Sequence, residues 1–134
     1  MGNNKTESII KDTEKMFEEY INALQQSAIY EQFCEKVYGY PFKLMNMMSK
    51  RDIDLIIDEI IEEQPKNILD IGCGTGDFIN LLNQQYNCSY TGIEISHNIV
   101  DTLNKLNNFS NINFKTGSIN NLECLENSIF DIIF

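Results

Sequence analysis

Leu69-Asp70-Ile71-Gly72-Cys73-Gly74-Thr75-Gly76 is the stretch that decides the fold of this 134-residue sequence. A short apolar run at residues 67–71 leads into it, and a helical pattern at residues 78–86 follows it. Three glycines allow the main chain to turn sharply and a ligand to approach it closely. In open α/β sheets the crevice beyond the carboxyl end of such a strand binds ligands. We therefore expect a ligand site at this turn.

Strands and helices alternate after the turn. The predicted elements are strands at 90–95, 112–115 and 130–134, a helix at 96–106 with Ser96 as its N-cap, and a short turn or helix at 121–126. Alternation of this kind predicts a parallel sheet that is covered on both faces, in an α/β protein.

The sequence before residue 65 predicts only helices. They lie at 7–24 and 29–38, and a third opens at Ser49, after an apolar connector at 42–48, and closes at Pro65. The expected buried stripe of the third helix is Ile53, Ile56, Ile57, Ile60 and Ile61. We therefore expect a helical cap at 1–64 and a ligand-binding half-domain at 65–134, forming one continuous structural unit.

The overall charge excludes some classes of partner. With 10 basic and 20 acidic side chains, the formal net charge is −10, so we expect no nucleic acid and no anionic membrane as a partner. The longest uncharged apolar run is too short to span a bilayer, and the first 15 residues lack the apolar core of a secretory signal.

The cysteines and the single histidine predict no metal site. Cys34, Cys73, Cys88 and Cys124 are widely spaced, and the C-x-x-C spacing of zinc ligands is absent. We interpret them as free thiols in a reducing cytosol, which predicts a cytoplasmic protein, with two disulfides as the alternative.

The glycine turn favours a ligand without phosphate. A dinucleotide fingerprint would require glycine at position 77, which is Asp77, and a carboxylate there would repel a pyrophosphate. A P-loop would require a lysine, and none is near. The turn carries Asp70 and Asp77 and no basic residue, which suits a positively charged ligand.

Glu94 supports a ligand that contains ribose. It ends the second predicted strand, 18 residues after Gly76. In doubly wound folds an acid about 20 residues beyond the glycine turn binds ribose hydroxyls. The two oxygens of a carboxylate can accept from both hydroxyls.

These motifs resemble those of class I S-adenosylmethionine-dependent methyltransferases. The matching segments are residues 69–76, Gly92-Ile93-Glu94-Ile95-Ser96 and Phe130-Asp131-Ile132-Ile133-Phe134. Residues 33–39 resemble the N-terminal cap of the small-molecule branch, so the likeness spans residues 33–134. It implies a Rossmann-like sheet with strand order 3-2-1-4 behind an N-terminal helical cap.

The resemblance also implies roles for individual residues. Asp70 and the backbone of Gly72, Cys73 and Gly74 would hold the methionine end of the cofactor, and Gly76, which ends the turn, is also expected to bind the cofactor. The remaining cofactor-binding residues would be Glu94 at the ribose, Ile95 on the adenine, and Ser118 and Ile119 at the adenine edge; many relatives have Asp in place of Ser118. Met48 and Ser49 would lie nearest the cofactor on the substrate side.

The family continues beyond the fourth strand, whereas this sequence stops at Phe134. We therefore expect a truncated chain, weakly active or inactive alone, whose exposed strand-4 edge promotes self-association; the alternative is one half of an assembly that another chain completes. No catalytic residue is assigned. The predicted function is methyl transfer from S-adenosylmethionine to a small-molecule acceptor. The alternatives are a non-catalytic nucleotide-binding or interaction module of the same fold and, disfavoured by Asp77, a nicotinamide dehydrogenase.

Overall fold

The computed structural model, which describes residues 3–40, 42–43, 48–125 and 129–134, contains one parallel sheet. Its strands are β1 (Asn67–Ile71), β2 (Ser89–Glu94), β3 (Ile112–Thr116) and β4 (Ile132–Ile133). The strand order β3-β2-β1-β4 confirms the predicted order. In the centre, Leu69 of β1 pairs with Thr91 of β2 and with Ile133 of β4. The glycine turn therefore leaves the sheet from a strand that has neighbours on both sides.

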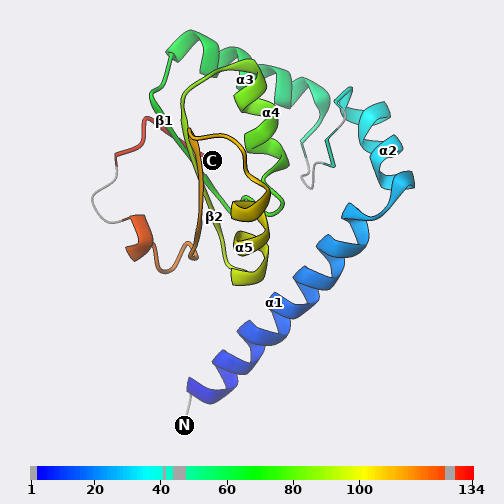
Figure 1. The fold of residues 1–134 in the computed structure, drawn as a ribbon, viewed down its shortest axis with the longest axis vertical. Helices are drawn as coiled ribbons and strands as arrows, with labels where there is room; N and C mark the ends of the chain where they lie inside the picture. Colours follow the sequence, from blue (N-terminus) through cyan, green and yellow to red (C-terminus); the bar gives the residue numbers. More distant parts are fainter. Residues whose placement is uncertain (1–2, 41, 44–47, 126–128) are drawn as a thin grey trace.

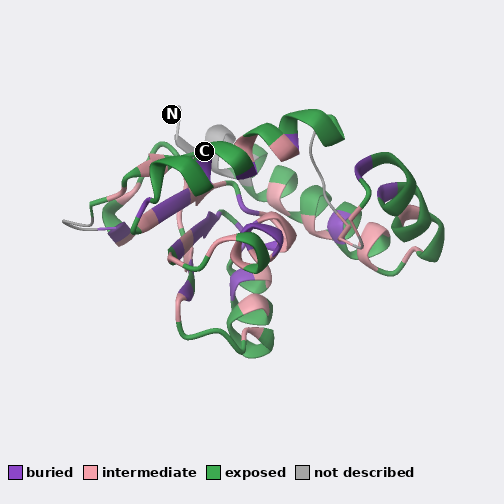
Figure 2. Cartoon of the chain, turned by 90° about the horizontal axis from the view of Figure 1, so that it is seen from above, coloured by how far each residue is buried: buried purple, intermediate pink, exposed green. Residues whose placement is uncertain are grey.

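Three helices cover one face of the sheet: α3 (Lys50–Glu63), α4 (Asp77–Gln85) and α5 (His97–Leu106). A single core cluster joins Ile57 of α3, Ile79 of α4 and Val100 of α5 to Ile68 and Tyr90 of the sheet. Right-handed crossovers from β1 to β2 and from β2 to β3 place α4 and α5 on the same face. Figure 2 shows the buried residues gathered on the strands and on the helix surfaces that face them.

The opposite face has a much thinner cover than expected. In the described part of the chain, the connection from β3 to β4 contains only the 3-10 helix η1 (Glu123–Leu125), and Leu125 packs on Leu69 and Ile93. Figure 1 shows η1 across the sheet from α4 and α5. The connection from β3 to β4 passes over this opposite face and covers it with one 3-10 helix. Among the described residues, α-helices therefore cover one face of the sheet, whereas the prediction was that both faces are covered.

The helical cap consists of α1 (Asn3–Gln25), α2 (Ala28–Tyr38) and α3. Ser27 accepts a hydrogen bond from the Tyr30 amide at the start of α2, and Ser49 and Asp52 form a reciprocal capping box at the start of α3. Such side chains satisfy amide groups that a helix leaves unpaired at its first turn. The boundaries of α2 and α3 agree with the predicted ones to within one or two residues.

One part of the predicted α3 stripe is wrong. Ile53, Ile57 and Ile60 are buried and Ile56 is half-buried, but Ile61 is 47% exposed. Adjacent helical positions are about 100° apart, so Ile60 and Ile61 do not face the same neighbour. The buried face of α3 is narrower than the apolar pattern suggests.

Candidate functional site: a cavity at the glycine turn

A cavity of about 710 Å³ lies at the carboxyl ends of β1 and β2. The turn from Gly72 to Thr75 forms one wall, and the N-terminal half of α1 forms another. Cavities of this size are typical of small-molecule sites. The structure therefore has a ligand-sized cavity where the sequence predicts one.

The glycine turn is fixed by main-chain hydrogen bonds. The amides of Gly72 and Cys73 donate to the carbonyl oxygen of Ile93 at 2.7 and 3.0 Å, and the amide of Gly74 donates to Glu94 Oε2 at 3.1 Å. Gly72 and Gly74 have φ angles of +85° and +52°, and a Cβ on either would meet no atom within 4 Å. Their main chain is thus open to a ligand, but the amides of Gly72, Cys73 and Gly74 already donate hydrogen bonds within the protein.

Gly76 lies at a tightly packed position beside β3. It does not line the cavity, and a Cβ at this position would lie 2.8 Å from Phe114 Cζ on β3. Its φ of +70° also favours glycine at the N-cap of α4. The sequence cannot separate Gly76 from the other two glycines, because the clash comes from a strand almost 40 residues later.

Glu94 lies at the edge of the cavity with its carboxylate already oriented. Its side chain is only 7% exposed, and its two oxygens accept hydrogen bonds from the amides of Gly74 (3.1 Å) and Ser96 (2.9 Å). An ionised carboxylate offers about four lone-pair sites. Two main-chain donors therefore leave about two sites for hydroxyl groups of a ligand.

Asp70 lines the same cavity and makes no hydrogen bond to any residue that the structure describes. Burial and, to a lesser degree, the nearby charge of Glu94 raise the pKa of Asp70 to about 6. Two carboxylates facing one cavity without a basic neighbour favour a ligand that brings positive charge. No basic side chain is among the described residues that line this cavity.

Most of the other residues expected at the site line the cavity as well. These are Cys73, Ile95, Ser118, Ile119 and, on the substrate side, Met48. Burial, together with the charges of Asp70 and Glu94, raises the pKa of the Cys73 thiol, which disfavours a nucleophilic thiolate. Ser49 does not line the cavity, since its hydroxyl is committed to Asp52 in the capping box of α3.

The sequence did not single out the α1 residues that complete the cavity. Ile9, Thr13, Glu14 and Phe17 line it together with Phe134. The helical spacing of Ile9 and Phe17 indicates an apolar face, but spacing does not say which surface that face approaches. The sequence therefore indicates the apolar face of α1 but does not identify the cavity that this face lines.

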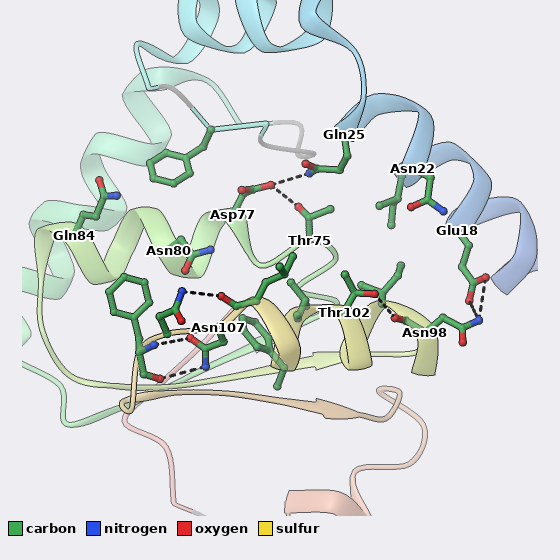
Figure 3. Close-up of a pocket in the computed structure, with 18 residues that line it drawn as sticks. Glu18, Asn22, Gln25, Thr75, Asp77, Asn80, Gln84, Asn98, Thr102 and Asn107 are labelled. Carbon is green, nitrogen blue, oxygen red and sulfur yellow. Dashed lines mark hydrogen bonds between the residues drawn. The ribbon is translucent and has the colours of Figure 1, made fainter.

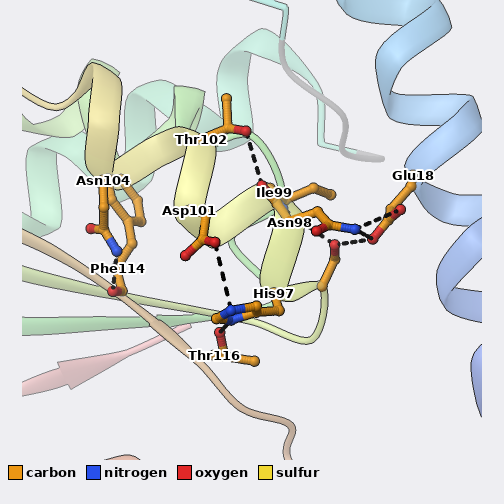
Figure 4. Close-up of polar contacts among 10 residues, drawn as sticks. Glu18, His97, Asn98, Ile99, Asp101, Thr102, Asn104, Phe114 and Thr116 are labelled. Atoms are coloured by element: carbon orange, nitrogen blue, oxygen red, sulfur yellow. Dashed lines mark hydrogen bonds and ion pairs between the residues drawn. The ribbon is translucent and has the colours of Figure 1, made fainter.

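Two polar contacts hold α1 over the half-domain. Glu18 accepts hydrogen bonds from the hydroxyl of Ser96 and from the side-chain amide of Asn98 at the start of α5 (Figure 4). Gln25 donates to Asp77 at 2.9 Å at the start of α4. Both contacts join α1 to the start of a helix that follows a strand, so α1 crosses the edge of the sheet where the cavity lies.

His97 lies outside this cavity. Its ring is largely exposed, with Nδ1 at 3.3 Å from Thr116 Oγ1 and Nε2 at 3.6 Å from Asp101 Oδ2 (Figure 4). It does not line the cavity and therefore is no candidate for proton transfer there. Among the described residues there is also no cluster of three His, Cys, Asp or Glu side chains that could hold a metal ion.

Comparison with known families gives one match to the sequence. The profile of a family described as a methyltransferase domain matches residues 62–134, more than half of the chain. A search of curated proteins found no match. No helix in the described ranges is long and apolar enough to cross a membrane.

Solved structures share the fold. A Galdieria sulphuraria protein assigned as a sarcosine dimethylglycine methyltransferase is 25% identical over 63% of this chain and 34% of that one, with a TM-score of 0.54. A Staphylococcus aureus protein assigned as a caffeoyl-CoA O-methyltransferase is 19% identical over 91% and 59%, with a TM-score of 0.57. SAH-bound Podospora anserina methyltransferase PaMTH1 is 16% identical over 100% and 58%, with a TM-score of 0.55. The chain thus spans between a third and three fifths of the length of these proteins.

Proposed function

The chain belongs to the methyltransferase domain family, and on that premise we propose that it binds S-adenosylmethionine in the cavity at the glycine turn, as part of an enzyme that methylates a small molecule. One observation carries this proposal. The amides of Gly72, Cys73 and Gly74 are committed, while the carboxylates of Asp70 and Glu94 face the cavity. Such a site accepts hydrogen bonds and positive charge, and it offers few donors to a phosphate.

The cofactor fits these groups by charge and by hydrogen bonding. Asp70, which lacks a partner among the described residues, suits the cationic methionine end, and the open main chain at Gly72 and Gly74 lets that end approach. The two free lone-pair sites of Glu94 suit the ribose hydroxyls. Ile95, Ser118 and Ile119 then form the wall for the adenine.

The opposite wall suits an acceptor without negative charge. Ile9, Phe17, Met48 and Phe134 supply apolar surface, and Glu14 supplies a carboxylate. When bound, S-adenosylmethionine supplies an electrophilic methyl group on a sulfonium. The contribution of this chain is to hold cofactor and acceptor in line, which can supply on the order of 7–11 kcal/mol of the barrier. We assign no catalytic residue.

The proposal extends to the organisation of the protein. We treat residues 1–64 as the cap and 65–134 as the cofactor-binding half-domain; the core cluster shared by α2, α3 and the sheet supports one continuous unit. Ile133, which is 59% exposed on β4, supports self-association at that edge. The described cysteines are free thiols, which supports a cytoplasmic location.

Calorimetric titration with S-adenosylmethionine, its demethylated product and NAD tests the cofactor. We expect the first two to bind and NAD not to bind. Glu94→Gln weakens binding of S-adenosylmethionine about 10-fold or more, because hydrogen bonds to a charged group are worth about 1.5–3 kcal/mol. The matched control is Glu62→Gln on the exposed surface of α3. Tighter binding of NAD, or an unchanged affinity of Glu94→Gln, would overturn the assignment.

Methyl transfer from labelled cofactor to a panel of amines, alcohols and carboxylates separates an enzyme from a non-catalytic module. We expect transfer to uncharged or cationic acceptors. Cofactor binding without transfer to any acceptor would favour the binding module.

A further inference from the structure

A second cavity, of about 550 Å³, lies between α1, α4 and α5 (Figure 3). It shares Ile21, Thr75 and Asp77 with the cavity at the glycine turn, so one wall separates the two. The cofactor proposed above uses none of its other lining residues.

Carboxamide side chains dominate its polar lining. Asn22 on α1 and Asn80 and Gln84 on α4 are labelled around it in Figure 3. None of these three side chains makes a hydrogen bond to a residue in the described ranges. Each carboxamide offers two N–H donors and one acceptor oxygen. Donors and acceptors are therefore available together, from two different helices.

The charged groups at this cavity are already engaged. Asp77 accepts hydrogen bonds from Gln25 at 2.9 Å and from Thr75 at 2.6 Å, and burial raises its pKa above the usual value, although these two bonds and the nearby Lys43 act in the opposite direction. Glu18 accepts a hydrogen bond from the side-chain amide of Asn98. An incoming cation is therefore not needed to balance these carboxylates. An anion is disfavoured, because no described basic side chain lines the cavity.

Much of the remaining lining is apolar. Leu103 and Leu106 of α5 lie there with Phe109 and Phe114, and Phe42 lies on the side of the cap. Aromatic side chains contribute large apolar area at a binding surface. A ligand for this cavity needs one apolar face besides its hydrogen-bonding groups.

We propose that this cavity is a second small-molecule site, which takes an uncharged polyhydroxyl compound such as a sugar. A hydroxyl group both donates and accepts, as a carboxamide does, so the two are complementary without any net charge. The C–H face of a sugar ring supplies the apolar surface that the leucine and phenylalanine wall requires. This site is independent of whether the neighbouring cavity binds S-adenosylmethionine.

Titration of the isotope-labelled chain with glucose, ribose and maltose tests the site by NMR. We expect at least one sugar to shift the side-chain amide signals of Asn22, Asn80 and Gln84. Glucose 6-phosphate and glucosamine are the anionic and cationic comparators, and we expect both to bind more weakly than glucose.

Variants connect the binding to this cavity. Asn80→Leu and Gln84→Leu each lose one hydrogen-bonding side chain, and we expect about threefold to tenfold weaker sugar binding. Gln32→Leu, on the exposed surface of α2, is the matched control with unchanged binding. Glu94→Gln should also leave sugar binding unchanged, which distinguishes this site from the proposed cofactor site. The proposal would be overturned if none of the three sugars shifted these signals, or if glucose 6-phosphate or glucosamine bound more tightly than glucose. It would also be overturned if Asn80→Leu and Gln84→Leu bound sugar as tightly as the unchanged chain.

Discussion

The glycine turn and α1 form two walls of the same cavity, but the chain holds them in different ways. The turn is tied to β2 by main-chain hydrogen bonds to Ile93, and β2 itself lies in the buried core. The α1 helix is held by the side chains of Glu18 and Gln25, and it leaves Phe17 50% exposed.

This difference indicates a rigid wall and a more weakly held one. Main-chain hydrogen bonds within a packed core resist local opening, whereas a helix with few buried contacts opens at low free energy. The rigid wall carries the groups that must be placed accurately, Asp70 and Glu94. The weakly held wall is the one that can move when a ligand enters.

The largest expected effect comes from filling the space beside the rigid wall. In Gly92→Val, the Cβ alone would lie 2.7 Å from Cys73 Sγ, 2.8 Å from Phe114 Cδ1 and 2.9 Å from Ile79 Cδ1. We expect a loss of about 3 kcal/mol in the free energy of unfolding, measured by urea denaturation. Thr91→Val, the adjacent position on β2, is the control and should change stability by less than about 1 kcal/mol. Equal stability of the two variants would mean that the core at the turn is not tightly packed.

An intermediate effect comes from the charge of Asp70. Its pKa is raised from 3.8 to about 6 in the folded chain, so the folded state holds this proton more tightly than the unfolded state. The ligand-free chain therefore loses stability as the pH rises from about 4 to about 6. At pH 7, Asp70→Asn should gain about 1–3 kcal/mol in the free energy of unfolding and show a flatter pH profile.

The same substitution should weaken binding of S-adenosylmethionine, because the site loses its free negative charge. The control is Asp58→Asn on the exposed surface of α3, which should leave both stability and binding unchanged. If the free energy of unfolding of Asp70→Asn depended on pH as it does in the unchanged chain, the raised pKa of Asp70 would be contradicted.

The smallest effect on global stability should come from the contacts of α1. Gln25→Leu removes the hydrogen bond to Asp77, and we expect a loss of about 0.5–1.5 kcal/mol. Amide hydrogen exchange should show faster exchange in α1 with little change in β1 and β2. Gln26→Leu, at an exposed position just after α1, is the control. Equal acceleration throughout the sheet would show that α1 belongs to the same cooperative unit as the core, and the contrast between the two walls would fail.

Local patterns identified most of the elements but not all contacts. Ser96 and Ser49 mark helix ends, since capping depends on neighbouring residues in the chain. Ile61 was placed on the wrong side of α3, because apolar character does not specify which face meets the core. Met45 and Met47, which belong to the predicted apolar connector, lie outside the described residues.

By itself the sequence determined the parallel sheet, its strand order through the family resemblance, and the meeting of Asp70, Gly72, Gly74 and Glu94 at one edge. The parallel sheet and the shared edge follow from short-range patterns, because the carboxyl ends of adjacent parallel strands always share an edge, whereas the strand order rests on the resemblance. Only the tertiary structure decided that Gly76 packs on Phe114, that Glu18 and Gln25 hold α1 at that edge, and that carboxamides from two helices enclose a second cavity. Such contacts join residues that are distant in the chain, and no local pattern encodes which surfaces will meet.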